Sequence, residues 1–115
     1  MKLIIAIVQP GRLEAVKDAL SSVEVVRLTV VDCQGFGRTR GHRSDPAAGK
    51  LSVQLLRKVQ LQIGVNDAFV DATVDAITRA ARSDGGGEPG DGKIFVLPMD
   101  DCVRIRTGER GTEAI

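Results

Sequence analysis

The chain has 115 residues, two cysteines and no tyrosine or tryptophan, and its formal net charge is +1. This length corresponds to one domain, and a nearly neutral charge gives no general attraction to nucleic acid or acidic membranes. No apolar run reaches the roughly 20 residues that cross a bilayer, so we expect a protein that is not inserted in a membrane. The apolar run after Met1 and Lys2 lacks the length and cleavage site of a signal peptide, and with two thiols a cytoplasmic location is expected.

Apolar periodicity divides the first part of the chain into a strand, a helix and a second strand. Residues 3–8 form an unbroken apolar run that ends before Pro10, as expected of a buried strand. Apolar residues then recur at helical spacing over residues 13–23, and proline suits the first turn of such a helix. β-Branched residues dominate residues 25–33 and predict the second strand.

The next segment, from about residue 35 to residue 55, is rich in glycine and arginine and shows no usable periodicity. A loop of this length in a compact domain is either functional or disordered. We therefore predict a large loop over about residues 37–56. Its charged residues would either steer it to an acidic partner surface or keep it solvated, and they are Arg38, Arg40, Arg43, Lys50 and Asp45.

The second half of the chain repeats the pattern of strand and helix. Strict alternation over residues 58–65 predicts a third strand, and an apolar stripe over residues 70–81 predicts a second helix, capped by Asn66 or Asp67. A second glycine-rich loop follows at residues 83–92, then a fourth strand at 94–97. A tail over residues 103–115 begins with a short fifth strand at 103–106, where apolar residues alternate with arginine.

This order predicts a single α+β domain over residues 1–115. Two βαβ halves build a ferredoxin-like βαββαβ domain, in which a four-stranded antiparallel sheet carries both helices on one face. The other face of the sheet, which includes Val31, would be uncovered in a monomer. Symmetric self-association is the expected remedy.

Glycines and cations occur together in three separate stretches. In Gly90-Asp91-Gly92-Lys93, backbone N–H groups can converge on an anion while the lysine supplies a point charge. Arg104 and Arg106, if they lie on a strand, share one face roughly 6.5–7 Å apart, near the spacing of neighbouring phosphates. Gly35-Phe36-Gly37-Arg38 is the third unit. Each unit alone fits an ordinary turn or a solvated surface equally well, but together they favour a polyphosphate.

In their order and spacing, these stretches resemble the nitrogen regulatory PII signal-transduction family. The similar segments are Gly35–Arg38, Gly41–His42, Lys58–Val59, Gly90–Val96, Arg104–Glu109 and the final Ala114–Ile115, so the resemblance covers essentially the whole chain. It implies a homotrimer that binds ATP or ADP, or AMP, in clefts between subunits. It also implies that the large loop docks on a target protein, either a membrane transporter or a metabolic enzyme.

The resemblance also implies which residues hold the nucleotide. Thr29 and Gly64 would lie near the adenine, and Arg104 and Arg106 would reach over from the adjacent subunit. The full implied set is Thr29, Gly35, Gly37, Arg38, Lys58, Gly64, Gly90, Asp91, Gly92, Lys93, Arg104 and Arg106.

The chain departs from the family pattern at several positions. Leu51 stands where many members carry a modified tyrosine, which excludes that modification, and the loop serines Ser44 and Ser52 are ordinary exposed residues. Thr39 stands where the family has the glutamine that binds Mg²⁺ between ATP and 2-oxoglutarate. We therefore assign no metal ligand from the sequence. Gln62 replaces a glutamate that pairs with the turn lysine.

Two further departures concern the second loop and the oxo-acid. The loop over residues 83–92 is about three residues longer than in the family, whereas Lys58, which reaches the oxo-acid's distal carboxylate in sensing members, is kept. We therefore expect a nucleotide-binding regulator of nitrogen metabolism. The alternative is a PII-like regulator of inorganic-carbon uptake or carbon fixation, which senses ADP or AMP and bicarbonate instead of 2-oxoglutarate.

Two other classes of function fit the sequence poorly. The single histidine, His42, lies in the predicted large loop, where we expect it to have no special role, so we expect no Ser/His/Asp catalytic set and no enzyme. RNA-recognition domains of similar topology stack bases on exposed aromatic residues of the sheet, and this chain has only three phenylalanines. We therefore expect no nucleic-acid partner.

Overall fold

The computed structural model describes residues 1–40 and 51–115, and their side chains except those of residues 38–40 and 51–54. Four strands form one sheet in the order β2-β3-β1-β4, with each neighbouring pair antiparallel. The strands are β1 (Lys2–Val8), β2 (Thr29–Arg40), β3 (Leu51–Val65) and β4 (Gly92–Pro98). The helices are α1 (Leu13–Ser22) and α2 (Val70–Ala81), with 3-10 turns η1 (Pro10–Arg12), η2 (Asp67–Phe69) and η3 (Gly111–Ala114).

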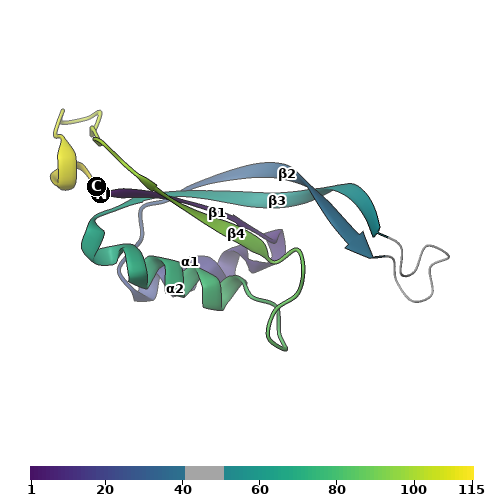
Figure 1. The fold of residues 1–115 in the computed structure, drawn as a ribbon. Coiled ribbons are helices and arrows are strands. Elements are labelled where there is room, and N and C mark those ends of the chain that lie inside the picture. Colours follow the sequence, from purple (N-terminus) through teal and green to yellow (C-terminus); the bar gives the residue numbers. More distant parts are fainter. Residues whose placement is uncertain (41–50) are drawn as a thin grey trace.

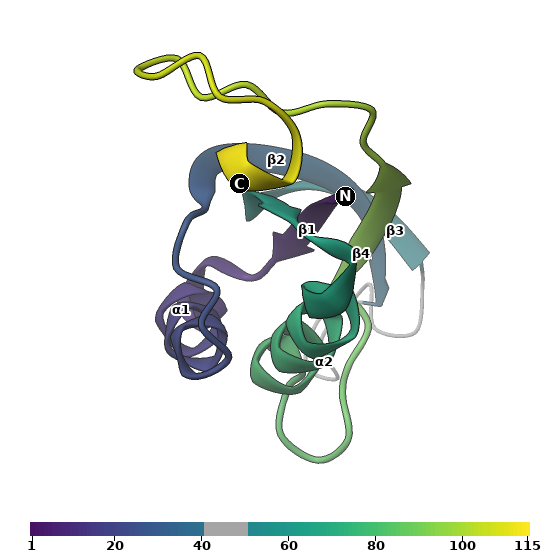
Figure 2. The same cartoon turned by 90° about the vertical axis from the view of Figure 1, so that its left-hand side faces the viewer.

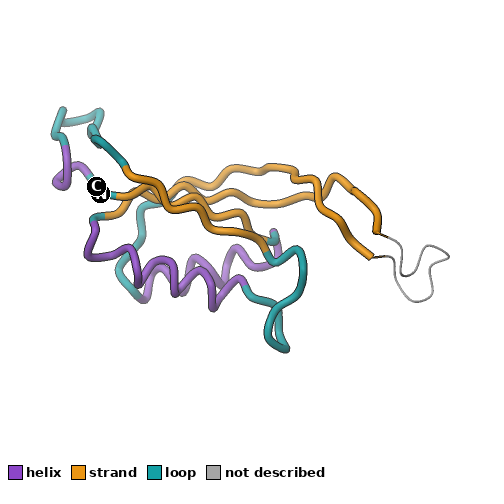
Figure 3. Tube along the Cα trace, viewed as in Figure 1, coloured by secondary structure: helices purple, strands orange, loops and turns teal. Residues whose placement is uncertain are grey.

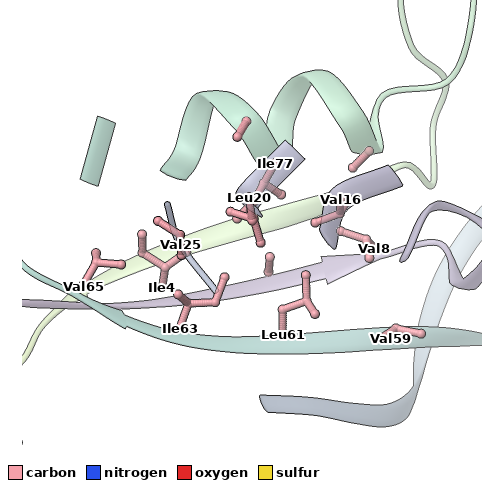
Figure 4. Packing of buried hydrophobic residues seen from close by; sticks show 13 residues of the cluster. Ile4, Val8, Val16, Leu20, Val25, Val59, Leu61, Ile63, Val65 and Ile77 are labelled. Carbon is pink, nitrogen blue, oxygen red and sulfur yellow. The ribbon is translucent and has the colours of Figure 1, made fainter. Parts of the chain in front are cut away.

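Both helices lie on the same face of the sheet, so the predicted ferredoxin-like arrangement is confirmed (Figure 1). The core forms between them because alternate residues of the strands point toward the helices. In Figure 4 the side chains of Ile4, Leu61 and Ile63 rise from the sheet toward Leu20 and Ile77. All five are completely buried. No helix within residues 1–40 and 51–115 combines the length and apolar character that a bilayer crossing requires.

Strands β2 and β3 are longer than the sequence pattern predicts. They pair in continuous register from Thr29 opposite Gln62 to Arg40 opposite Leu51. The predicted loop over 37–56 is therefore wrong for residues 37–40 and 51–56, which belong to a strand hairpin that extends past the helices (Figure 3). Beyond the helices no core imposes apolar alternation on a strand, which is why periodicity missed it.

The second strand also begins later than predicted, at Thr29 instead of residue 25. Residues 25–28 connect α1 to β2, and within them Val25 is buried in the core while Val26 is exposed. His42 and Ser44, on which the sequence analysis commented, lie outside the described residues.

The predicted fifth strand at 103–106 is not formed. Val103 makes one isolated bridge to Arg110, and the chain between them turns back on itself. The N–H of Gly108 donates to the carbonyl of Arg104 at 2.7 Å, and Gly108 has a φ of +75°. This C-terminal turn projects from the sheet near the N-terminus (Figure 2). Because these residues bond to one another, they do not add a strand to the sheet.

The start of α2 also differs in detail from the expectation. Asn66 occupies the position before η2, but its side chain makes no capping hydrogen bond there. Its Nδ2 donates instead to the carbonyl of Thr112 at 3.4 Å. Asp67 accepts a hydrogen bond from the N-terminal ammonium of Met1 at 2.8 Å, which lowers the pKa of its carboxyl.

Candidate functional site

Half of the predicted site residues lie on the sheet face that the helices leave open. Odd-numbered residues of β3 from Val59 to Val65 are buried against the helices, so its even-numbered residues face the other way. The strand register then assigns six predicted residues to the open face: Thr29, Gly35, Gly37, Lys58, Gly64 and Lys93. Val31, Phe95 and Leu97 are also exposed on this face, as expected for a surface that no part of one chain covers.

Lys58 reaches the glycine turn from the neighbouring strand. Its Nζ donates a hydrogen bond to the carbonyl oxygen of Gly90 at 2.5 Å, and only 9% of the residue is exposed. Gln9 donates to the same carbonyl oxygen through its Nε2 at 2.7 Å. Lys58 forms no ion pair with the residues that the structure describes. A lysine that is largely buried as a residue and has no ion pair among the described residues favours an anion beside the turn.

Asp91 organises the loop that carries the turn. Its carboxylate accepts hydrogen bonds from the hydroxyl of Ser83, from the N–H of Ser83 at 2.9 Å and from the N–H of Glu88 at 2.9 Å. These hydrogen bonds, with that from the Ser83 hydroxyl as the largest cause, lower the pKa of Asp91 to about 2. The carboxylate is therefore ionised at neutral pH and closes the loop from Ser83 to Asp91.

Gly92 meets a strict steric requirement at the start of β4. Its φ is +122°, and a Cβ atom built there would lie 1.8 Å from the carbonyl oxygen of Ile7 on β1. Only glycine fits so close an approach of two backbones. Gly90, with a φ of +96°, also has a backbone conformation that favours glycine. The turn motif found in the sequence is thus a structural necessity, whatever it binds.

The largest of the described cavities touches this turn from the helix side. It has a volume of about 670 Å³ and lies between α2 and β4, where Ile77, Ala81 and Ile94 form apolar walls. Asp91 and Gly92 contribute to its lining, whereas Lys58 lies on the opposite side of the sheet.

Arg104 and Arg106 do not lie side by side on a strand as predicted. Arg104 is half-buried and donates from Nη1 to the Glu109 carboxylate at 3.0 Å and from Nη2 to the carbonyl of Glu113 at 3.1 Å. Arg106 is exposed on the turn. The C-terminal segment lies at the opposite end of the sheet from the loop at 83–91 (Figure 1). One chain therefore does not bring these arginines to the glycine turn.

Two contributors to the turn, Gln9 and Ser83, were missed in the sequence. Gln9 stands before Pro10 with no motif around it, and only the fold brings it to Gly90, 81 residues further on. Ser83 could have been found from the preference of serine and aspartate for hydrogen bonds within turns. The side chains of Arg38, Thr39, Leu51 and Ser52 are outside the described part of the structure. Within that part, no three His, Cys, Asp or Glu side chains cluster as metal ligands would.

Comparisons with known proteins agree with this geometry. The family model of nitrogen regulatory protein P-II matches residues 1–109. The chain belongs to this family of nitrogen regulatory signalling proteins. The resemblance noted in the sequence is therefore confirmed over nearly the full length.

Individual relatives support the same family. The chain is 44% identical over 115 residues to the nitrogen regulatory protein GlnK1 of Methanosarcina mazei, and covers 97% of it. It is also 44% identical over 115 residues to the nitrogen regulatory protein P-II of Synechocystis, and covers all of it. Among solved structures, B. subtilis GlnK superposes with a TM-score of 0.80 at 29% identity, over 99% of this chain and 97% of that one.

Proposed function

We propose that this P-II family member is a homotrimeric regulator that binds ATP or ADP in clefts between its subunits. The observation that carries the proposal is Lys58, a largely buried residue whose ammonium bonds to Gly90 of the glycine turn. Phosphates are the anions that such a combination of cation and turn suits best. The six predicted residues share the open face, which supports a position of the rest of the nucleotide along the sheet.

The placement of the arginines supports a site shared between subunits. Gly64 and Lys58 are six residues apart on β3, roughly 20 Å along the strand, which accommodates an extended nucleotide. The C-terminal segment, to which Arg104 and Arg106 belong, lies beyond the far end of the sheet from the turn (Figure 1). They can meet phosphates at a glycine turn only if that turn belongs to another copy of the chain.

The open face supports self-association independently. It exposes Val31, Phe95 and Leu97 on the side of the sheet opposite the two helices. Burying such a face between identical subunits removes apolar area from water and is the usual reason for closed symmetric assembly. We propose a trimer because the family resemblance implies three equivalent clefts.

In this proposal the molecule acts on a target protein and has no catalytic role. The β2–β3 hairpin extends away from the body (Figure 1). Gly37 and Arg38 lie in the outer part of β2, so nucleotide and target contacts would be adjacent. A nucleotide would shift the hairpin between states through its different affinity for each. Because Cys33 and Cys102 are both free thiols, we propose a reducing cytoplasm as the location.

The named relatives favour nitrogen metabolism. They are nitrogen regulatory proteins, and none of them supports control of inorganic-carbon uptake. Calorimetry with ATP, ADP and AMP, each with and without Mg²⁺ and 2-oxoglutarate, identifies the effectors. Tighter binding of ATP in the presence of 2-oxoglutarate is the result expected of a nitrogen sensor.

Arg104→Ala tests the shared cleft. We expect the variant to lose detectable nucleotide binding in calorimetry while its mass by light scattering stays that of a trimer. Mixed assembly with Lys58→Met subunits restores a fraction of the sites, because some clefts then combine two intact halves. Unchanged affinity of Arg104→Ala, or no recovery in the mixture, contradicts a cleft between subunits. Glu109→Gln is the control: it removes the carboxylate that Arg104 pairs with in the C-terminal turn but keeps the arginine.

A further inference from the structure

The β2–β3 hairpin carries an exposed apolar pair that the nucleotide site does not use. Phe36 lies directly opposite Leu55 in the strand register. Phe36 is 77% exposed and Leu55 54% exposed, although large apolar side chains at paired positions of a sheet are usually covered. Gln34 and Arg57 form the next pair toward the body, and both are exposed. These four residues are called the outer hairpin face below.

The outer hairpin face continues the surface on which the two helices pack. Val59 is buried against the helices, and Arg57 and Leu55 follow it at intervals of two along β3, so strand alternation places them on the same side. The helix layer stops short of the hairpin, as Figures 1 and 3 show. The sheet therefore presents a helix-binding surface that no element of this chain covers within the described residues.

We propose that the outer hairpin face binds an acidic amphipathic helix of a partner protein, which extends the helix layer along the hairpin. The inference rests on the proposed regulatory function and names the chemistry of the partner. A helix fits because side chains on the flat of a two-stranded ribbon pack as the body of this sheet packs on α1 and α2. A strand would instead bind to the hydrogen-bonding edge and leave Phe36 and Leu55 uncovered.

Charge determines which helix is recognised. Arg57 is exposed and flanks the apolar pair on the side of the body. Acidic residues beside the apolar stripe of the partner would meet this cation, whereas a basic helix would be repelled. The surface is distinct from the nucleotide site, because Gly35, Gly37 and Lys58 belong to the other face of the strands.

The test uses the full-length trimer and a synthetic helical peptide as the probe. The peptide has leucines at positions i, i+3, i+4 and i+7 with glutamates beside them, and its binding is followed by fluorescence anisotropy and by amide shifts. We expect the amides of residues 34–36 and 55–57 to shift. We expect Leu55→Ser to weaken binding on the order of tenfold, since burial of one leucine side chain is worth about that factor.

Matched variants make the result specific. Val26→Ser removes an exposed valine, 68% accessible, that lies between α1 and β2 away from the hairpin. This variant should bind the peptide like the unmodified protein. Arg57→Glu should no longer bind the acidic peptide and should bind a peptide in which lysines replace the glutamates. Equal binding by Leu55→Ser and Val26→Ser, or equal binding of a scrambled acidic peptide, overturns the proposal.

Two further measurements distinguish the partner-helix proposal from the nucleotide-binding proposal and from a membrane-binding surface. In calorimetry, Leu55→Ser should bind ATP with the affinity of the unmodified protein within about twofold. If neither the unmodified protein nor any variant binds ATP, the proposed nucleotide-binding function is wrong, whereas the partner-helix proposal is judged by the peptide. Vesicles with phosphatidylserine should not bind in the absence of peptide. If vesicles bind through Leu55 and the peptide does not, the face is a membrane surface and the partner-helix proposal is wrong.

Discussion

Lys58 and Gly90 are joined by a hydrogen bond of 2.5 Å although 32 residues separate them in the chain. The bond brings the ammonium of a largely buried lysine from β3 to the turn before β4. Gln9, from the end of β1, bonds the same carbonyl oxygen, so three segments converge on one atom. This convergence defines the part of the candidate site that one chain can build.

Lys58→Met tests the charge of this site. Methionine keeps the length and apolar stem of the side chain but cannot attract phosphate. We expect ATP affinity in calorimetry to fall roughly 10- to 100-fold, the equivalent of about 1.5–3 kcal/mol for a hydrogen bond to a charged group. Lys17→Met is the control, since Lys17 forms an ion pair with Glu14 on α1. Equal affinities in the two variants would remove Lys58 from the site.

Gly92→Ala tests the close approach of β4 to β1. The added Cβ would clash with the carbonyl oxygen of Ile7, and the φ of +122° is unfavourable for alanine. We expect the free energy of unfolding in urea to fall by more than about 3 kcal/mol at a fixed protomer concentration. Gly11→Ala, where nothing lies within 4 Å of the new atom, should change it little. Similar stability in both variants contradicts the strand register at Gly92.

The lowered pKa of the Asp91 carboxyl predicts how the stability of the protein depends on pH. Its pKa is lowered from 3.8 to about 2, so its contribution to stability is present above the unfolded value and is lost as the pH falls from about 4 toward 2. Ser83→Ala removes the largest cause, and we expect the pKa of Asp91, followed by carbon-detected NMR, to rise toward 3.8. Ser22→Ala, whose hydroxyl bonds only the carbonyl of Ala19, should leave it unchanged. No rise in Ser83→Ala would refute the hydrogen-bonded loop.

Glu24 offers a substitution that should stabilise the protein. It has a φ of +66° just after α1, where its N–H donates to the carbonyl of Ser21 and the N–H of Val25 donates to that of Leu20. Glycine is the residue best suited to this helix termination. We expect Glu24→Gly to raise the free energy of unfolding by about 0.5–1 kcal/mol. Glu14→Gly, within the first turn of α1, should lower it by a similar amount, and a loss of stability in Glu24→Gly would contradict the assigned backbone.

The sequence predicted the elements that face the core. Residues 3–8, 58–65 and 70–81 were identified correctly because a buried surface forces apolar residues into the period of the element. The outer hairpin and the C-terminal turn were missed, since neither packs on a core. At residues 103–106, alternation of apolar and arginine residues predicted a strand, but local hydrogen bonds of Arg104 to Glu109 and Gly108 formed a turn instead.

For the site, the sequence by itself determined the chemical groups and the family, because glycines, lysine and arginines stand at family spacing. Only the tertiary structure decided their grouping. It brought Lys58 and Gln9 to Gly90 and bonded Asp91 within the loop that begins at Ser83. It left the C-terminal segment, to which Arg104 belongs, at the far end of the sheet. Spacing along a chain fixes which side chains share an element, but contacts between distant segments follow from how strands pair and helices cover them.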